Sequence, residues 1–480
     1  MTVPFEIELK LECQPADRDA IVGADALAGA TPVTRRLVST YFDTPDRVLE
    51  RNGFSLRVRR IGDSVVQTVK ADGGPTAGLF ARPEWECPLT DETPRIDAGS
   101  PIAALLAGRT VVPLFVSDIS RAIWTLATAD ATIEVALDLG EVRAGAHRHP
   151  VSDLELELKA GQAGALFALA HRLDAVAPLR LGVLTKSERG RLLLADPARP
   201  AARAASPRLD PEDDAAGAFA AIARACLHQF RLNETLVIAA GDAAAIHQAR
   251  VGLRRLRAAF ALFRPILAGD VTAARLRADL RWLTGVLADV RALDVLIAAP
   301  GHAGHGRLLA ARADALARAR ATLAEPRARR LMLDLAEWLA VGDWRTASAR
   351  AAMPIARLAA DLLDHSRRRL KRRGRDLAAL DDARRHRARI AAKTLRYASA
   401  FFATLWTGRK AERRHAEFIA ALETLQDRLG ALNDMAAAPM LHARLGLAPP
   451  PALSRRERAH LLDRAAAAHE RLMDMKRFWR

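Results

Sequence analysis

The chain has 480 residues, a formal net charge of +17, and only 5% aromatic residues. This length is enough for two to four domains. Residues 1–200 hold 23 basic and 27 acidic side chains, so the positive excess lies in the remainder, whose net charge is +21. We therefore expect the C-terminal part to bind a polyanion. The scarcity of aromatic residues argues against base stacking, and so against a nucleic-acid partner.

The cysteines indicate a reducing compartment. Cys13, Cys87 and Cys226 are isolated and odd in number, which argues against disulfides and against a thiolate metal site. No apolar run approaches membrane-spanning length, and the N-terminus lacks the basic-then-apolar pattern of a signal peptide. We therefore predict a cytoplasmic protein without membrane contact.

Charged and apolar residues alternate near the start of the chain. A strand over Glu6–Lys10 presents Glu6, Glu8 and Lys10 on one face and apolar residues on the other. The same pattern returns in residues 155–159, with Glu155, Glu157 and Lys159 on one face. A single strand of this kind is often a solvated surface. The repetition instead favours a charged face that several strands share.

Further strand candidates lie between these two segments and also carry charges at strand spacing. Their charged or polar positions are Arg57 and Arg59, Thr68 and Lys70, Glu84 and Glu86, Arg121, and Glu134 and Asp138. A helix is predicted near residues 162–175, before the segment Thr185–Gly190. Glu84 and Glu86 fit the shared face, but such pairs are equally common on a solvated strand.

Two arrangements of these strands are open. The charged faces could point to solvent, or the sheet could close with the charges inside and helices covering its apolar outer face. Carboxylates about 4 Å apart repel by roughly 4 kcal/mol at an effective dielectric constant near 20, so exposed like charges are usually interspersed with cations. Here the two signs are segregated on different strands. Segregation favours a lumen with a carboxylate wall for Mg²⁺ and a basic wall for phosphate.

The motifs resemble the CYTH family, also called triphosphate tunnel metalloenzymes. The matching motifs occur in the family's order over about residues 3–195: Glu6-x-Glu8-x-Lys10, Tyr41-Phe42-Asp43-Thr44, Leu56-Arg57-x-Arg59, Thr68-x-Lys70, Glu134-x-x-x-Asp138, Glu155-x-Glu157-x-Lys159 and Lys186-Ser187-x-Arg189-Gly190. The resemblance implies a closed antiparallel tunnel of about eight strands. It also implies hydrolysis of triphosphates, or cyclisation of ATP in one branch, with Mg²⁺ or Mn²⁺.

The resemblance implies a role for individual residues. The metal ligands would be Glu6, Glu8, Asp138, Glu155 and Glu157. The phosphate chain would be bound by Lys10, Arg57, Arg59, Lys70, Arg121 and Lys186. Catalysis would depend most on Glu6, Glu8, Lys10 and Lys70. The motifs name no general base.

A proline-rich segment separates this part from the rest of the chain. Residues 197–211 carry four prolines and little apolar periodicity, which predicts a linker between domains at 1–196 and 212–480. Asp210-Pro211-Glu212 predicts the start of a helix. The sequence beyond is rich in Ala, Leu and Arg and reads as helical. Its expected breaks lie near Gly241, Gly269, Pro300, Pro326, Pro354, Gly408 and Pro449.

The helical part contains an internal repeat with an offset of 139 residues, which also maps Asp242 onto Asp381 and Phe263 onto Phe402. Its members are His247, Arg250, Arg254 and Arg257 in the first copy, and His386, Arg389, Lys393 and Arg396 in the second. On a helix, these positions fall within about 80° of arc, so each copy presents one histidine and three cations on one face. Adjacent cations cost stability unless a polyanion offsets them.

The repeat resembles the CHAD family over about residues 210–480. A second echo relates residues 287–294 to residues 429–434, with Ala292 where the family usually has an acidic residue. The resemblance implies two bundles of about four helices each, near 212–342 and 354–480. It also implies that the eight residues of the repeated faces bind long-chain polyphosphate, and association with polyphosphate granules is a further hypothesis. The basic run 367–373 either extends the groove or is a solvated helix face.

The sequence therefore predicts an α+β protein of two domains: an N-terminal closed antiparallel β tunnel with covering helices, and a C-terminal all-α double helical bundle. The leading functional hypothesis is metal-dependent hydrolysis of inorganic triphosphate to pyrophosphate and phosphate, with polyphosphate binding by the helical domain. One alternative is an adenylate cyclase or nucleoside triphosphatase on the same tunnel. Another is a non-enzymatic polyphosphate-binding protein. No clear purine slot is evident, since Tyr41, Phe42 and Phe54 could all be packing residues.

Overall fold

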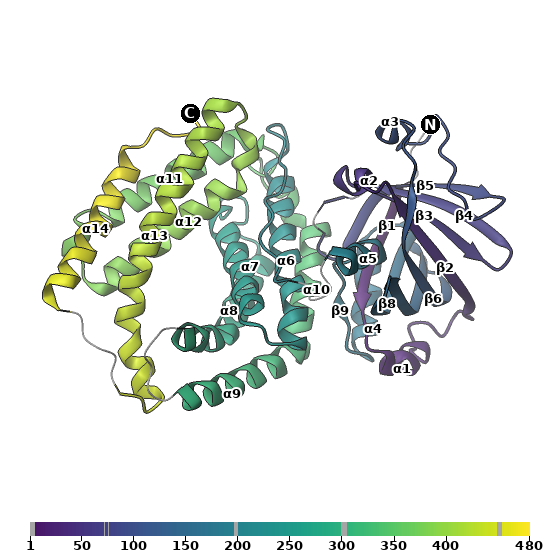
Figure 1. The fold of residues 1–480 in the computed structure, drawn as a ribbon, viewed down its shortest axis with the longest axis horizontal. Coiled ribbons are helices and arrows are strands. Elements are labelled where there is room, and N and C mark those ends of the chain that lie inside the picture. Colours follow the sequence, from purple (N-terminus) through teal and green to yellow (C-terminus); the bar gives the residue numbers. More distant parts are fainter. Residues whose placement is uncertain (1–4, 72, 75, 196–199, 299–304, 449–453) are drawn as a thin grey trace. The chain divides into compact units, whose positions relative to one another are not determined.

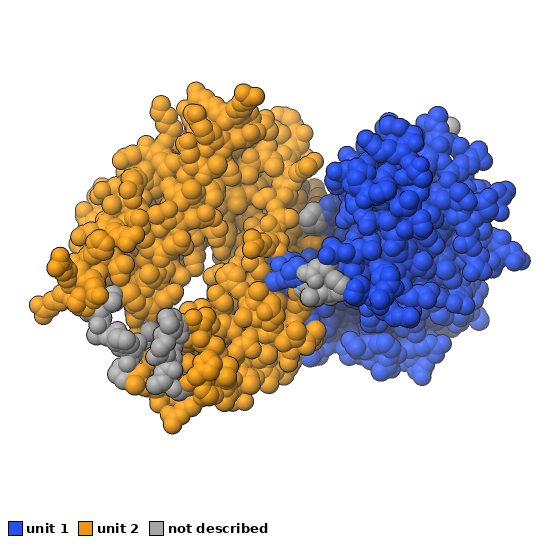
Figure 2. Space-filling model, viewed as in Figure 1, with its two compact units in different colours: residues 1–202, 231–235, 323–342 blue, residues 203–230, 236–322, 343–480 orange. Residues whose placement is uncertain are grey.

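The computed structural model describes residues 5–71, 73–74, 76–195, 200–298, 305–448 and 454–480 (Figure 1). The chain divides into two compact units, coloured separately in Figure 2. Unit 1 comprises residues 1–202, 231–235 and 323–342, and unit 2 comprises the remainder. The domain boundaries expected from the linker stay predictions. Among the described residues, no helix combines the length and the apolar character needed to cross a membrane.

Unit 1 is built around a closed barrel. The strands are β1 (Phe5–Glu12), β2 (Val33–Asp43), β3 (Phe54–Ile61), β4 (Ser64–Ala71), β5 (Leu79–Leu89), β6 (Val112–Ala127), β7 (Ala131–Ala144), β8 (His147–Gly161) and the short β9 (Arg180–Leu181). Neighbouring strands follow the order β5-β4-β3-β2-β6-β7-β8-β1, and pairing of β1 with β5 closes the ring. All these pairings are antiparallel, which confirms the predicted tunnel of about eight strands.

The two segments with the repeated charge pattern are neighbours in the barrel. β1 pairs with β8 so that Glu8 lies opposite Glu157 and Lys10 lies opposite Glu155. Residues directly opposite each other in an antiparallel pair project from the same face of the sheet. The register therefore places a cation of one strand against a carboxylate of the other inside the barrel.

The barrel interior has an apolar part as well as a charged part. Val151 alternates with Asp153 and Glu155 along β8, so an inward-facing strand passes from apolar to acidic side chains. The apolar interior cluster comprises Leu37, Tyr41, Phe115, Ile119, Val142, Ala144, Val151 and Leu193. Leu193 belongs to helix α5 (Lys186–Ala195), which packs against β6, β7 and β8. One end of α5 thus contributes to the apolar core, while its first residue reaches the charged part.

Two local features fix the position of α5. Thr185 and Glu188 exchange hydrogen bonds between side chain and backbone, at 2.7 and 3.1 Å, which is the capping-box arrangement at a helix start. Gly190 lies against the ring of Phe115, and a Cβ at this position would come within 2.2 Å of that ring. The last glycine of the Lys186–Gly190 motif is therefore needed for close packing.

Short helices cover the outer face of the barrel, as predicted. These are α1 (Arg18–Val22), α2 (Val48–Arg51), α3 (Ala103–Leu106) and α4 (Gly164–Asp174). An outer apolar cluster joins α2 and α3 to β3 and β4 through Leu49, Leu56, Val69, Ile102 and Leu106. Asp43 caps α2, since its two carboxylate oxygens accept from the amides of Leu49 and Glu50 at 2.8 and 2.9 Å. This part of the Tyr41–Thr44 motif is structural.

The C-terminal part is helical, as predicted. Its helices are α6 (Ala215–Ala239), α7 (Ala243–Leu262), α8 (Val271–Ala298), α9 (His305–Ala324), α10 (Pro326–Val341), α11 (Ile355–Arg373), α12 (Asp382–Phe401), α13 (Arg409–Arg444) and α14 (Arg455–Asp474). α10 belongs to unit 1 rather than unit 2, as do residues 231–235 of α6. Expected breaks at Pro300 and Pro449 lie outside the described residues. The break after α11, at Gly374, was not predicted.

The start of the first helix differs from the prediction. Asp210 and Pro211 form a turn, in which the carbonyl of Asp210 accepts from the amide of Asp213 at 3.0 Å. Helix α6 begins at Ala215 and is capped by Asp214. The cap lies beside Pro354 at the start of α11, so this later contact selects the start. The predicted helix start is therefore four residues early.

Corresponding positions of the repeat play the same structural roles. Asp242 and Asp381 cap α7 and α12, accepting from backbone amides three residues on at 3.1 and 2.6 Å. Phe263 and Phe402 follow the ends of these helices, and their rings meet with centroids 5.9 Å apart. The two copies of the repeat are therefore equivalent helices that pack against each other.

Candidate functional site

The charged part of the barrel surrounds a cavity of ≈ 530 Å³ to which each of strands β1 to β8 contributes side chains. Ten of the eleven predicted tunnel residues line it, namely Glu6, Glu8, Lys10, Arg57, Arg59, Lys70, Arg121, Glu155, Glu157 and Lys186. The eleventh, Asp138, is fully buried behind them. Strand alternation placed the strand residues of this set on shared faces, whereas the family resemblance assigned them to the tunnel together with Lys186, which belongs to α5.

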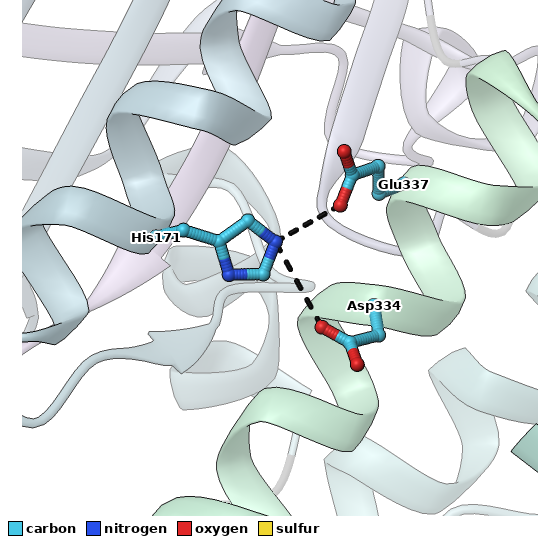
Figure 3. A group of neighbouring side chains, drawn as sticks. All are labelled: His171, Asp334 and Glu337. Atoms are coloured by element: carbon cyan, nitrogen blue, oxygen red, sulfur yellow. Dashed lines mark hydrogen bonds and ion pairs between the residues drawn. The ribbon is translucent and has the colours of Figure 1, made fainter. Parts of the chain in front are cut away.

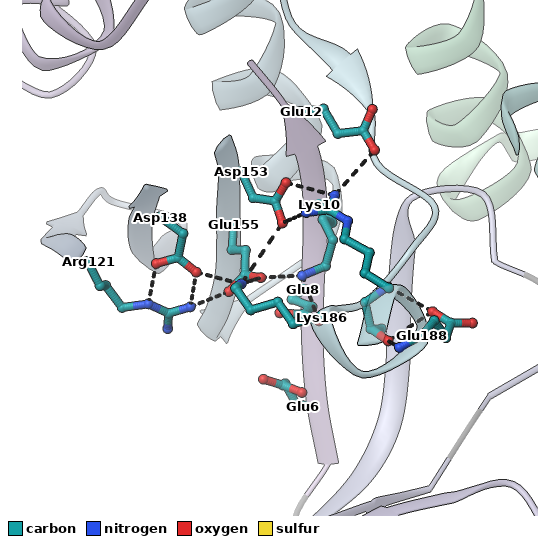
Figure 4. A network of polar contacts seen from close by, with 12 residues as sticks. Glu6, Glu8, Lys10, Glu12, Arg121, Asp138, Asp153, Glu155, Lys186 and Glu188 are labelled. Carbon is teal, nitrogen blue, oxygen red and sulfur yellow. Dashed lines mark hydrogen bonds and ion pairs between the residues drawn. The ribbon is translucent and has the colours of Figure 1, made fainter. Parts of the chain in front are cut away.

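Asp138 and Glu155 form a buried network with three cations (Figure 4). Arg121 donates two hydrogen bonds of 2.6 Å to Asp138 and one of 2.5 Å to Glu155. Lys186 lies 2.5 Å from Asp138 and 2.7 Å from Glu155, and Lys10 also donates to Glu155. Burial raises the pKa of each carboxyl, but the adjacent cations outweigh it and lower the pKa of both. Both groups are therefore carboxylates at neutral pH, already engaged with cations.

A second network connects β1 with β4 and β5. Glu6 lies 2.6 Å from Lys70, and Glu8 lies 3.0 Å from Arg82. Lys70 also contacts Glu84 at 3.1 Å. Glu84 thus belongs to the lumen. Arg82 was missed in the sequence analysis, although its alternation with Glu84 and Glu86 along β5 is the signal that could have found it.

Arg57 and Arg59 are less well compensated than the other lumen cations. Arg59 donates to Ser39 Oγ at 3.0 Å, and no carboxylate in the described part of the chain forms an ion pair with it. Burial, Arg57 and Arg121 lower the pKa of Arg59 to about 9, so it stays protonated at neutral pH. The buried Nε of Arg57 has no hydrogen-bond partner. These two guanidinium groups therefore keep N–H donors that an anion in the cavity could use.

Carboxylates from β7 and β8 meet on another side of the cavity. Glu157 lies 2.6 Å from Lys159, which is also 3.9 Å from Glu134. Burial raises the pKa of Glu157, and Glu6 and Glu134 contribute to the same shift. These hard oxygen donors are the type that Mg²⁺ and Mn²⁺ prefer. The donor chemistry of Glu6, Glu8, Glu155 and Glu157 therefore fits such an ion.

The expected segregation of the two signs on different strands is wrong, because β1 carries Lys10 with Glu6 and Glu8, and β5 carries Arg82 with Glu84. Adjacent strands bring opposite charges into register, as for Lys10 and Glu155. Over the residues that the structure describes, no three tunnel oxygens converge as a ligand group in this conformation. Asp138 stays a predicted metal ligand, although Arg121 and Lys186 engage its oxygens here. Metal binding at these carboxylates thus requires the cations to move toward another anion.

The repeated cations of unit 2 form one basic face, which we call the α7–α12 face. It comprises His247, Arg250, Arg254 and Arg257 of α7, and His386, Arg389, Lys393 and Arg396 of α12. The two helices contact each other. The charges interact across the contact, since Arg254 lowers the pKa of Lys393 and Lys393 lowers that of His247. The structure therefore brings the two predicted sets together.

Most cations of the α7–α12 face lack a carboxylate partner. Among the described residues, only Arg396 of this set forms an ion pair, with Glu423 at 3.6 Å. Arg250 donates to the carbonyl of Thr284 at 3.0 Å, and the buried Nε of Arg254 has no hydrogen-bond partner. His386 lies 2.6 Å from the side chain of Asn433. The face therefore has the charge and the unused donors of an anion site.

Burial and mutual repulsion shift several pKa values in the α7–α12 face. Burial and then Arg291 and Arg254 lower the pKa of His247 to about 4. Burial and then Arg389 and Arg254 lower the pKa of Lys393 to about 7, although Asp434 opposes this. Arg291, from α8, lies outside the repeated set but is close enough to His247 to lower its pKa. His247 is therefore neutral near pH 7 in the absence of an anion.

The basic run 367–373 has a partly structural role. Arg367 donates to the carbonyls of Met473 and Met475, the second at 3.1 Å, and so holds the end of α14. Arg368, Lys371 and Arg372 are exposed. The hypothesis that the run extends the anion groove stays a prediction.

Comparison with known proteins identifies both parts of the chain. Residues 4–190 match the model of the CYTH domain, and residues 221–443 match the model of the CHAD domain. An inorganic triphosphatase of Haemophilus influenzae is 33% identical over 197 residues, which are 39% of this chain and 54% of that protein. The chain therefore spans about half the length of this curated relative.

Two solved structures are also similar. The CHAD domain from the plant Ricinus communis has 29% sequence identity and a TM-score of 0.47, and the match covers 57% of this chain and 90% of that chain. HpAC1 from Hippeastrum, an adenylyl cyclase candidate described as having a dominant triphosphatase activity, has 18% identity and a TM-score of 0.30. This match covers 39% of this chain and 95% of that chain.

Replacing Lys393 by Met is expected to stabilise the protein when no polyanion is present. The lowered pKa means that the folded state disfavours the charged form, so the cost of the charge is fully present below about pH 7. This cost decreases as the pH rises from about 7 toward about 10.4, which is the pKa of lysine in the unfolded chain. The melting temperature of the variant should exceed that of the wild type most at pH 6, and the difference should shrink by pH 10. Lys410→Met, at an exposed position, should show no such trend, and an equal trend in both variants would contradict this account.

Proposed function

The chain carries a CYTH domain followed by a CHAD domain, as its motifs predicted, and from this premise we propose that unit 1 hydrolyses inorganic triphosphate and unit 2 binds polyphosphate. The observation that carries the proposal is the charged cavity of the barrel, in which carboxylates and cations from seven of the eight strands meet. The similarity to an inorganic triphosphatase supports the choice of substrate. Hydrolysis would yield pyrophosphate and phosphate.

Phosphate binding would begin at the cations that lack full compensation. Arg57 and Arg59 can donate to phosphate oxygens without losing a close carboxylate partner, because among the described residues Arg59 has none and Glu84 is 3.7 Å from Arg57. Guanidinium groups bind phosphate oxygens through paired N–H donors. Lys10, Lys70, Arg121 and Lys186 would then exchange a carboxylate for a phosphate oxygen. Each such exchange keeps the cation paired, so the cost of separating charges is small.

The exchange would release the carboxylates that we assign to the metal. We infer that Mg²⁺ or Mn²⁺ is held by Glu6, Glu8, Asp138, Glu155 and Glu157, each of which pairs with a lumen cation in the structure. Such an ion, when bound, would neutralise phosphate oxygens and lower the pKa of a coordinated water. The cations would meanwhile orient the phosphate chain and stabilise charge on it as the bond breaks. Substrate and metal would therefore assist each other's binding.

The surroundings of the cavity support an inorganic substrate over a nucleotide. Tyr41 is buried and stacks on Phe115 with ring centroids 4.7 Å apart, so its ring is already covered. Phe42 and Phe54 pack in the outer apolar cluster. Phe5 is the exposed aromatic side chain on the cavity wall. A single exposed ring offers a base one stacking partner and no hydrogen-bonding slot.

The proposed activity is tested by product analysis. With Mg²⁺ or Mn²⁺, tripolyphosphate should be cleaved to pyrophosphate and phosphate faster than ATP is hydrolysed, because the described cavity wall offers many cations for phosphate and one exposed ring for a purine. Ion chromatography of the phosphates and chromatography of the adenine nucleotides would measure both reactions. Cyclic AMP as the main product would favour the cyclase alternative. Absence of turnover on both substrates would leave the binding-protein alternative.

Glu8→Gln should lower kcat by roughly 10²-fold or more, because it removes the charge of an assigned metal ligand from a preorganised site. Glu8 is 4% exposed and contacts Arg82 through its carboxylate, so the melting temperature must be measured beside the activity. Glu92→Gln, at an exposed position paired with Arg60, serves as the matched control. A wild-type rate for Glu8→Gln would contradict the site assignment.

Binding of long-chain polyphosphate should depend on the α7–α12 face. Reversing Arg254 and Lys393 together to Glu should abolish most of the affinity, because it removes two cations without carboxylate partners and adds two repelling charges. Binding is measured by titrating the full chain with polyphosphate in the absence of metal. Affinity of the wild type should fall steeply as salt rises, since phosphate contacts release counterions.

The control for this experiment is a double reversal of Arg409 and Lys410 to Glu, which changes the net charge equally at exposed positions outside the face. It should leave affinity nearly unchanged. Equal losses in the two double variants would show that unit 2 attracts polyanions by net charge alone.

A further inference from the structure

A group of potential metal ligands lies away from the barrel cavity, where α4 packs against α10 (Figure 3). His171 of α4 points between Asp334 and Glu337, which lie on one face of α10 because they are three residues apart. We propose that His171, Asp334 and Glu337 bind a divalent transition-metal ion such as Zn²⁺. The proposal does not depend on the function assigned to the cavity.

The distances between the donor atoms suit such an ion. His171 Nε2 lies 2.9 Å from a Glu337 oxygen and 3.8 Å from an Asp334 oxygen. The three donor atoms all lie within 4.8 Å of one another. Ligands at about 2.0–2.1 Å from a tetrahedral Zn²⁺ are separated by roughly 3.3 Å, which falls between the two measured distances. Small rotations of the carboxylates would therefore complete the geometry.

The backbone of the site is held in place by other contacts. Asp174, one turn after His171 on α4, lies 3.3 Å from Arg329 and 2.9 Å from Arg330 of α10. These ion pairs fix the two helices against each other beside the three ligands. The site therefore does not need the metal in order to form. Its histidine lies 163 or more residues before its two carboxylates in the sequence.

The donor set favours a transition metal over the ion expected in the cavity. An imidazole nitrogen suits Zn²⁺ and its neighbours, whereas Mg²⁺ prefers oxygen ligands throughout. The side chains of His171, Asp334 and Glu337 are 33%, 21% and 36% exposed, so an ion can enter and water can complete its coordination.

The site is tested by counting tightly bound Zn²⁺ on the full chain. Protein freed of metal by a chelator is titrated with Zn²⁺ in excess Mg²⁺, which competes at sites made of carboxylates alone, and the stoichiometry is read by calorimetry. The wild type should bind about one more ion per chain than Asp334→Asn/Glu337→Gln. Co²⁺ added in place of Zn²⁺ should give a visible absorption band that the double variant lacks. Glu325→Gln, at an exposed position just before α10, should behave as the wild type.

A variant with a single substitution distinguishes loss of the metal site from loss of folding. His171→Gln removes the nitrogen ligand while it keeps a polar side chain and both carboxylates, and it should lose the same ion. Melting temperatures measured in chelator show whether each variant is folded, and Zn²⁺ should raise that of the wild type alone. Equal Zn²⁺ stoichiometry in the wild type and a folded variant would overturn the proposal and identify the three side chains as an ion pair.

Discussion

A charge removed from water must be compensated, and unit 1 is organised by this constraint. Ionised groups cost several kcal/mol each when they are buried without a partner. In the barrel, strand alternation directs carboxylates and cations inward, and the register of β1 with β8 sets Lys10 against Glu155. Asp138, which is fully buried, is held by Arg121 and Lys186. The lumen charges are thus compensated without a ligand, and the proposed function would exchange these pairs for a phosphate chain and a metal ion.

The cations of unit 2 differ from those of the lumen in how far they are paired with carboxylates. The α7–α12 face gathers Arg250, Arg254 and Lys393 without carboxylate partners in the described part of the chain, and repulsion and burial lower the pKa of Lys393 to about 7. Apolar packing between the two helices, such as that of Phe263 against Phe402 at their C-terminal ends, supports the face. The structural cost of the face is therefore offset by the core of unit 2, and a polyanion would relieve it. Most lumen cations of unit 1 are therefore paired with carboxylates, whereas most cations of the α7–α12 face are not.

Much of this arrangement could be predicted from the sequence, because the governing patterns are local. Alternation along strands placed Glu6, Glu8 and Lys10 in the lumen, and helical periodicity placed the repeated cations on one face. Such local patterns could not predict contacts between distant segments of the chain. Arg82 pairs with Glu8 only because β1 and β5 close the barrel. The start of α6 at Ala215 depends on its contact with the start of α11, and the sequence pattern near Pro211 does not predict that contact.

The division of the chain into units also follows from long-range contacts rather than from the proline-rich segment. Arg231 is 2% exposed, and it donates to the carbonyl of Leu181 at 2.8 Å and to Glu12 at 3.2 Å. Glu12 in turn accepts from Arg189 of α5 at 3.3 Å. A buried arginine has to satisfy its donors where carbonyl and carboxylate oxygens are available. Residues 231–235 and α10 therefore belong with the barrel, although both follow the predicted linker in sequence.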